Sequence, residues 1–420
     1  MRVGLTATFT IAVSGTAPIT LQWRKGATVV ATTMVGAAGT QLVSQSSSHT
    51  TPATVAGDDG AQYSVVASNG FGSVTSSSAR LTVVSQRLFV TDGASLLLWN
   101  NPHTLSTARP ADLALALPGA RAVATFGSQV FVLGNAGIAN WADGLSVTAL
   151  SAPSFTIPLT ALTPAPTQPL TRLTTATMGD GLSLLAWSQE GAWRLSLPGP
   201  VSANPTTRAA FKHPFNQLPS LVYVPLASSG GDRLFMGQIS GAGLLAWNGA
   251  GLATGQPMHD FATTNANVWA LALSNSRLVG GGSFGAGTPS TGIGLWNTPG
   301  TFSAPRAADV MLASTAGTFS TNDFIADLSC DGAVLAAGVQ NLSNQRLLVW
   351  GNVDTATAAS APSFSGVLPA SPKRVFSLAG RHYTLTQTDV VLFATPIAGM
   401  TLTTIATLNG FGFTDFAVAR

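Results

Sequence analysis

The residues best placed to act as a nucleophile or a phosphate cradle lie in the glycine-rich segment GGGSFG, residues 280–285. It contains G-x-S-x-G with Ser283 at its centre, and also G-x-G-x-x-G from Gly280 to Gly285. The first motif needs a sharp turn from a strand into a helix, and the second needs a helix N-terminus that faces the phosphate. The flanking residues predict strands and turns, so we interpret the segment as a glycine-rich turn between strands.

Two carboxylates fall within short apolar runs: Asp327 in FIADLS and Asp415 in FTDFAV. If these runs are inner strands that face a central channel, the two side chains could bind a cation or act as an acid–base pair. The alternative, which we favour, is that each carboxylate accepts hydrogen bonds from neighbouring backbone. The sequence predicts no catalytic residue, no bound metal and no cofactor, and Asp327 and Asp415 are its candidates for ligand binding.

Histidine and cysteine offer little further chemistry. The five histidines are His49, His103, His213, His259 and His382, and none has the spacing of a metal site. His259 is followed by Asp260 and could polarise a water, but such a pair in a turn is usually part of a solvated loop. Cys330 is the only cysteine, so no disulfide can form within the chain, and we interpret it as a small core residue.

The composition indicates a β-rich protein of short strands and many turns. Only 8% of the 420 residues are charged, against about 25% in an average protein, while 44 are Gly and 24 are Pro. The net charge of +3 is small and the basic residues are scattered, which argues against a nucleic-acid partner. The sequence lacks an apolar run long enough for a membrane span. The beginning MRVGLTATF lacks the features of a signal peptide, so we expect either a mature or trimmed form or a true start upstream.

The first 84 residues alternate apolar and polar side chains in short runs that are typical of antiparallel strands. Trp23 in LQWRKG and Tyr63 in DDGAQYSV have the contexts of the strand C tryptophan and the tyrosine corner of an immunoglobulin sandwich. The segment resembles bacterial immunoglobulin-like domains of the I-set kind. The resemblance implies that Trp23 and Tyr63 are structural, and that Ile11 and Val65 replace the inter-sheet disulfide.

The same comparison indicates that the usual first strand is missing. Residues Thr6–Val13 would then present an unpaired strand edge that can accept a strand from another chain, in a head-to-tail contact that propagates. The alternative is that the missing strand lies upstream of Met1.

From Arg87 onward the sequence repeats a plan of a short strand, a turn and a second strand that ends in an aromatic residue. The repeated aromatics are Trp99, Trp141, Trp193, Trp247, Trp296, Trp350 and Phe393, and a proline follows most of them at Pro110, Pro153, Pro205, Pro257, Pro305 and Pro362. Periods of 42 to 54 residues with about four strands predict a seven-bladed β-propeller. We expect the aromatics to pack between blades rather than to stack on sugars.

The first copy lacks a preceding apolar run, and Phe413–Arg420 supplies a spare one that could close the ring. The pattern LLLWN…ARPADL, with its relative LWN…APRAADV, is similar to bacterial propeller repeats of the NHL type. That resemblance implies a platform for binding or scaffolding.

We therefore predict an all-β chain with an immunoglobulin-like domain at residues 1–85 and a propeller at residues 86–420, joined by almost no linker. The predicted function is non-catalytic: an extracellular or cell-surface bacterial protein for adhesion or scaffolding. Its predicted partners are a protein or glycan on the propeller loops, and further copies in a homo-oligomer or filament. The alternative is a glycan lyase or hydrolase with its site at the channel mouth.

Overall fold

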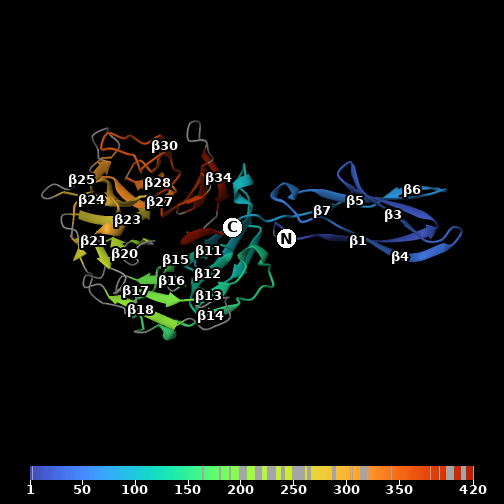
Figure 1. The fold of residues 1–420 in the computed structure, drawn as a ribbon, viewed down its shortest axis with the longest axis horizontal. Helices are drawn as coiled ribbons and strands as arrows, with labels where there is room; N and C mark the ends of the chain where they lie inside the picture. The colour runs from blue at the N-terminus through green and yellow to red at the C-terminus, as the bar shows by residue number, and fades with distance from the viewer. Residues whose placement is uncertain are drawn as a thin grey trace. The chain divides into compact units, whose positions relative to one another are not determined.

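The computed structural model describes residues 1, 3–162, 165–178, 181–188, 191–197, 206–212, 220–224, 233–237, 242–247, 261–262, 266–285, 290–302, 304, 306–312, 319–320, 322–341, 343–378, 380–386, 388–393, 402–407 and 413–419. They form two compact units, Met1–Arg87 and Leu88–Ala419. Within these ranges the chain consists of strands and short 3-10 helices without any α-helix, which confirms the all-β prediction (Figure 1). The 3-10 helices are η1 (Ala56–Asp58), η2 (Pro102–Thr104), η3 (Gly144–Ser146), η4 (Leu159–Ala161) and η5 (Pro299–Thr301).

The first unit is a sandwich of two antiparallel sheets, drawn in blue in Figure 1. One sheet contains β1 (Thr8–Thr16) and β4 (Gln41–Thr50). The other has the order β3 (Thr28–Val35), β2 (Ile19–Lys25), β5 (Gln62–Asn69) and β6 (Gly72–Thr75), with β7 (Ala79–Arg80) also on β5.

The core of this unit forms as the alternating sequence predicts. Leu21, Trp23 and Val65 are buried, and Phe9 and Ile11 of β1 pack against them from the other sheet. Because the side chains of a strand alternate between its faces, every second residue of β2 and β5 is buried. Ile11 and Val65 thus lie in one apolar cluster with Trp23, where packing holds the two sheets without a disulfide.

The N-terminal residue Met1 lies beside the last residues of the first unit. The amino group of Met1 donates to the carbonyl of Thr82 at 2.8 Å, and Val84 N–H donates to the Met1 carbonyl at 2.7 Å. Among the described residues, β4 is the one strand that pairs with β1, so the other edge of β1 carries no strand.

The second unit is built from four-stranded antiparallel groups. One sheet has the order β10 (Leu113–Ala116), β9 (Ser95–Asn100), β8 (Arg87–Thr91) and β35 (Asp415–Ala419). The next two contain β11 (Ala122–Phe126), β12 (Gln129–Gly134), β13 (Gly137–Trp141) and β14 (Phe155–Ile157), then β15 (Arg172–Met178), β16 (Gly181–Ser188), β17 (Gly191–Ser196) and β18 (Thr206–Lys212).

A larger sheet of eight strands follows: β19 (Ser220–Val224), β20 (Arg233–Gly237), β21 (Ala242–Trp247), β22 (Phe261–Ala262), β23 (Ala266–Leu273), β24 (Arg277–Phe284), β25 (Ser290–Asn297) and β26 (Val310–Leu312). Among the described residues, strand pairing joins its two halves through a short parallel pairing of β21 with β23. The last two sheets contain β27 (Phe324–Asp331), β28 (Val334–Gln340), β29 (Arg346–Trp350) and β30 (Phe364–Val367), then β31 (Arg374–Leu378), β32 (Arg381–Leu385), β33 (Asp389–Phe393) and β34 (Leu402–Thr407).

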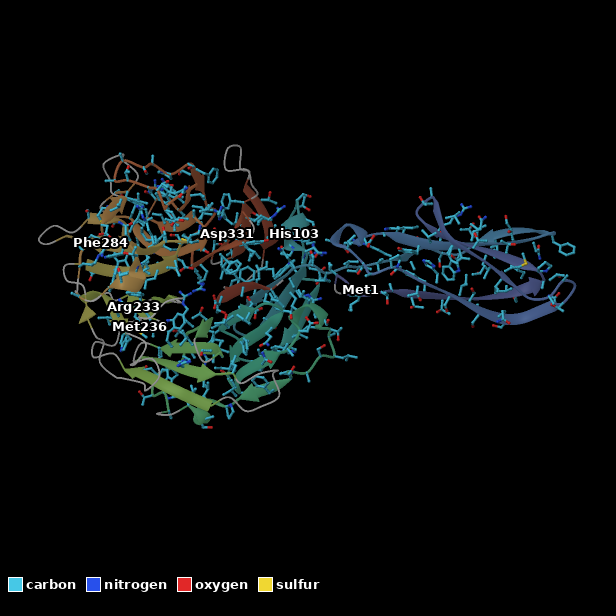
Figure 2. The ribbon with its side chains drawn as sticks, viewed as in Figure 1. Met1, His103, Arg233, Met236, Phe284 and Asp331 are labelled. Atoms are coloured by element: carbon cyan, nitrogen blue, oxygen red, sulfur yellow. The ribbon has the colours of Figure 1, made fainter. Side chains whose placement is uncertain are left out.

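In each group one end strand, which we call its first strand, contacts the first strand of a neighbouring group; in the group of β8, β9 and β10 this strand is β35. β31 contacts β35, β35 contacts β11 and β11 contacts β15, while β19, β23, β27 and β31 contact in series. The apolar core lies between neighbouring groups: Leu88, Val90 and Trp99 of one sheet pack with Tyr383 and Leu392 of another. Buried side chains therefore fill the spaces between the sheets (Figure 2).

The glycine-rich segment is not the turn that the sequence predicts. Gly280 to Phe284 lie inside the central strand β24, which is paired on both sides by β23 and β25. A Cβ at Gly282 would stand 1.8 Å from the carbonyl oxygen of Asn267. The glycine is thus explained by the close approach of the neighbouring strand, and the turn prediction was wrong.

Candidate functional site

Asp327 and Asp415 lie on the first strands of two separate sheets, β27 and β35, and the structure brings them to a single arginine. Their exposed fractions are 8% and 1%. Arg374, the first residue of β31, places its Nε 3.0 Å from Oδ1 of Asp415 and 3.5 Å from Oδ2 of Asp327. The strand β31 contacts both β27 and β35, which is why its arginine reaches both carboxylates.

Each carboxylate is also bonded to the backbone of an adjacent sheet. Oδ2 of Asp327 accepts the N–H of Val375 at 2.9 Å, and Oδ2 of Asp415 accepts the N–H of Val123 at 3.1 Å. These bonds run from β27 to β31 and from β35 to β11. Each aspartate therefore fastens its own sheet to the next.

A second arginine, Arg172 at the start of β15, lies close to the same charges. Burial and then the positive charge of Arg374 lower the pKa of the Arg172 guanidinium, while Asp415 and Asp327 act in the opposite direction. For Arg374, burial acts to lower the pKa of the guanidinium, but the two aspartates outweigh it and the pKa is raised. The four side chains form a charge-balanced cluster, which we call the inner-strand quartet.

The quartet is poorly suited to acid–base catalysis or cation binding. Both carboxylates are already engaged by Arg374 and by backbone N–H groups of adjacent sheets, so neither is free to contact a substrate. A cation would have to displace Arg374 from both aspartates. No group of three or more His, Cys, Asp or Glu residues suited to a metal ion is present among the described residues.

Further side chains connect the first strands in the same way. Ser377 N–H donates to Oγ of Ser329 at 2.9 Å, and Gly380 N–H donates to Oδ2 of Asp331 at 2.7 Å (Asp331 is labelled in Figure 2). Thr125 Oγ1 donates to the carbonyl of Val418 at 2.9 Å. Polar residues on the first strands thus serve as links between sheets, a role that the sequence analysis assigned to none of them beyond the two aspartates.

The repeated aromatics are buried between strand groups, as predicted. Their exposed fractions do not exceed 5% for Trp99, Trp141, Trp193, Trp247, Trp296, Trp350 and Phe393. In four copies the indole N–H donates to the carbonyl ten residues further along: Trp99 to Arg109, Trp141 to Ser151, Trp296 to Arg306 and Trp350 to Ser360, at 3.1 to 3.4 Å. Rings held in this way offer no face to a sugar.

Sequence reasoning missed a second bond in the same loops. The N–H that follows the tryptophan donates to a side chain twelve residues on: Asn100 to Asp112, Ala142 to Ser154, Asn297 to Asp309 and Gly351 to Ser363. Where the acceptor is aspartate, it also forms a salt bridge to the arginine three residues before it, Arg109 or Arg306. The repeated sequences ARPADL and APRAADV contain this arginine and aspartate at the same spacing, so the pair could have been found from the sequence. We call this arrangement the tryptophan loop clamp.

The remaining candidate residues that the structure describes have structural roles. Ser283 is buried in a paired strand, and the next described element of the chain is the strand β25. Cys330 packs against an apolar cluster, and burial raises the pKa of its thiol, which keeps it protonated. His103 lies in η2 and His49 stacks on Trp23. His213, His259 and Asp260 lie outside the described residues.

A serine–histidine pair that the sequence analysis did not single out lies on the hairpin of β31 and β32. Oγ of Ser377 is 2.8 Å from Nδ1 of His382, and the two residues are paired across the strands. His382 has no exposed surface, and burial lowers its pKa to about 4. The pair resembles a nucleophile and its base, but it is sealed in the core, so substrate cannot reach it.

Comparisons with known proteins match the first unit to a domain family. The family model of the immunoglobulin I-set domain matches residues 1–83, which confirms the predicted I-set type of the first unit. A search of curated proteins finds no match. Among the described residues, no helix is long and apolar enough to cross a membrane.

Several solved structures show a distant similarity. Sqt1 from Saccharomyces cerevisiae has 12% identity and a TM-score of 0.48, over 79% of this chain and 90% of that chain. The β-propeller domain of Nup133 from Vanderwaltozyma polyspora has 10% identity and a TM-score of 0.45, over 77% and 91%. A protein from Lactobacillus plantarum has 11% identity and a TM-score of 0.49, over 80% and 99%.

Proposed function

We propose that this chain is a non-catalytic binding or structural protein displayed outside a bacterial cell. The observation that carries the proposal is the inner-strand quartet. Its two carboxylates are engaged by Arg374 and by the backbone N–H groups of Val375 and Val123, so the acidic groups best placed for chemistry hold sheets together. The role we propose is adhesion or scaffolding, with a protein or glycan partner on the loops of the second unit.

The proposed architecture is an immunoglobulin-like domain at residues 1–85 and an NHL-like, seven-bladed propeller at residues 86–420. The strand pairing supports seven blades, because the eight-stranded sheet divides at the β21–β23 pairing and gives seven groups of four strands among the described residues. Pairing of β35 with β8 supports a ring whose first blade comes from both ends of the unit.

The unpaired edge of β1 supports the further proposal that copies of the chain associate through the immunoglobulin-like domain. An uncovered strand edge presents free backbone N–H and C=O groups that another strand can pair with.

The proposal is tested by incubating the whole chain with a panel of bacterial and extracellular glycans and measuring binding and turnover in parallel. We expect binding without new reducing ends or unsaturated products. Turnover that disappears in both Asp327→Asn and Asp415→Asn, but persists in the linking-residue control Asp331→Asn, would identify an enzyme and overturn the proposal. Antibody labelling of intact against permeabilised cells tests the surface location separately.

A further inference from the structure

The open edge of β1 is free of charge along its whole length. Thr8–Thr16 reads TFTIAVSGT, with Phe9, Ile11 and Val13 turned to the core and Thr8, Thr10 and Ala12 exposed on the other face. Natural open edges usually carry lysine, proline or inward charges that prevent pairing with another chain. The exposed hydroxyls of Thr8 and Thr10 instead bond to Thr50 and Ser48 of β4, at 2.9 and 3.0 Å.

An apolar groove adjoins the C-terminal end of this edge. It has a volume of about 270 Å³ and is lined by Val13 and Ser14 of β1, Ile19 of β2 and the β5–β6 hairpin from Ala67 to Val74. On that hairpin Phe71 is 86% exposed and Val74 is 67% exposed. Large apolar side chains left open beside an unpaired strand edge indicate a surface that a partner covers.

The groove and the β1 edge share Val13 and Ser14. The other strand of the same sheet, β4, also has one edge without a paired strand among the described residues, and Thr33 of the opposite sheet touches it only through its hydroxyl, 3.4 Å from Ser47 Oγ. Of the two open edges, the one on β1 is favoured because the apolar groove adjoins it.

We propose that the partner is β1 of a second copy of this chain, paired antiparallel about a two-fold axis at Ile11. This deepens the association named under the proposed function and rests on it. In that register Ile11 faces its own copy, Phe9 faces Val13, and Thr10 faces Ala12. Apolar residues meet apolar ones on the core face and small uncharged residues meet on the other face, so the strand is complementary to itself.

The two-fold register also brings the partner's Phe9 next to Val13, at the mouth of the groove. The ladder of β1 shifts at a bulge between Val13 and Gly15, which limits regular pairing to about Thr8 to Ser14. An isologous contact of this kind closes on itself, so it gives dimers and not the propagating head-to-tail contact predicted from the sequence.

Charge exchange on the edge tests the register. Thr10→Lys/Ala12→Lys places lysines opposite one another in the dimer, and Thr10→Asp/Ala12→Asp does the same with carboxylates, so each variant alone should weaken dimerisation at least about tenfold. Mixed in equal amounts, the two variants should form a heterodimer, because position 10 of one copy faces position 12 of the other. The matched control, Thr32→Lys/Met34→Lys on the edge strand β3, should dimerise like the unmodified chain.

Size-exclusion chromatography with light scattering over a concentration series measures the mass of the unmodified chain, of each variant and of the mixture. Circular dichroism confirms that each protein is folded. The expected result is a mass that rises from 42.7 kDa to twice that value and no further. If the unmodified chain forms species larger than a dimer, and the mixed variants do not recover association, the contact is head-to-tail and the two-fold contact is wrong. A monomer at every concentration, or a longer native chain whose own strand fills the edge, would overturn both forms of association while leaving the glycan result untouched.

Discussion

Arg374 is the residue on which the two buried aspartates depend. Removing one partner from a buried charge cluster leaves the other charges without compensation and costs about 3 to 5 kcal/mol in comparable sites. We expect Arg374→Gln to lower the free energy of unfolding by about 3 kcal/mol, measured by urea denaturation. The variant that also carries Arg172→Gln, Asp327→Asn and Asp415→Asn should recover part of that loss, since none of the four charges of the quartet then remains. Equal stability of Arg374→Gln and the unmodified chain would contradict the quartet.

His382 gives the protein a stability that depends on pH. Burial lowers its pKa from 6.5 to about 4, so as the pH falls the unfolded chain takes up the proton first. The stabilisation is complete above pH 6.5 and is lost progressively between pH 6.5 and 4, with a ceiling of about 3 kcal/mol from the linkage relation. We expect Tm to fall over this range, and to fall less steeply in His382→Gln. Parallel Tm–pH curves for the two proteins would show that His382 is not responsible.

The tryptophan loop clamp operates at the scale of a single repeat. The clamp has two versions, which differ in the residues ten and thirteen positions after the tryptophan. These are an arginine and an aspartate in the copies of Trp99 and Trp296, and two serines in those of Trp141 and Trp350. Asp112→Ala removes the acceptor for Asn100 N–H and the partner of Arg109, and should cost about 1 to 2 kcal/mol. The double change Arg109→Ser/Asp112→Ser converts the first version into the second and should cost less. Chemical denaturation measures the stability of both variants. An Asp112→Ala variant as stable as the unmodified chain would show that the clamp does not stabilise the fold.

The elements themselves could largely be predicted, because alternation of apolar residues reports which face of a strand is buried. Trp23, the repeated tryptophans and the apolar character of the first strands followed from the sequence for that reason. The glycines of β24 did not, since a side chain there would meet atoms of other strands, such as the carbonyl of Asn267 beside Gly282, which a sequence pattern does not reveal. The same limit applies to the quartet: Asp327 and Asp415 were identified, but Arg374 and Arg172 joined them only through contacts between sheets distant in sequence.

At the scale of the whole molecule, the proposed ring depends on the last strand. β35 pairs with β8, Thr414 N–H donates to the Thr91 carbonyl at 2.8 Å, and Asp415 contributes to the quartet. A chain that lacks residues 413–420 would expose the edge of β8 and leave Arg374 with one aspartate, so we expect a lower Tm and aggregation on heating.

Addition of the free peptide FTDFAVAR to the truncated chain should raise Tm again in proportion to the logarithm of peptide concentration, because a ligand that binds only the folded state stabilises it by mass action. A peptide of the same composition in scrambled order should have no effect, since Phe413, Phe416 and Val418 would no longer fall at the positions that pack in the core. Calorimetry on the truncated chain with each peptide separates the two cases. If truncation leaves Tm unchanged, the ring is not closed by this strand, and the two ends of the second unit must be held by the packing between neighbouring sheets alone.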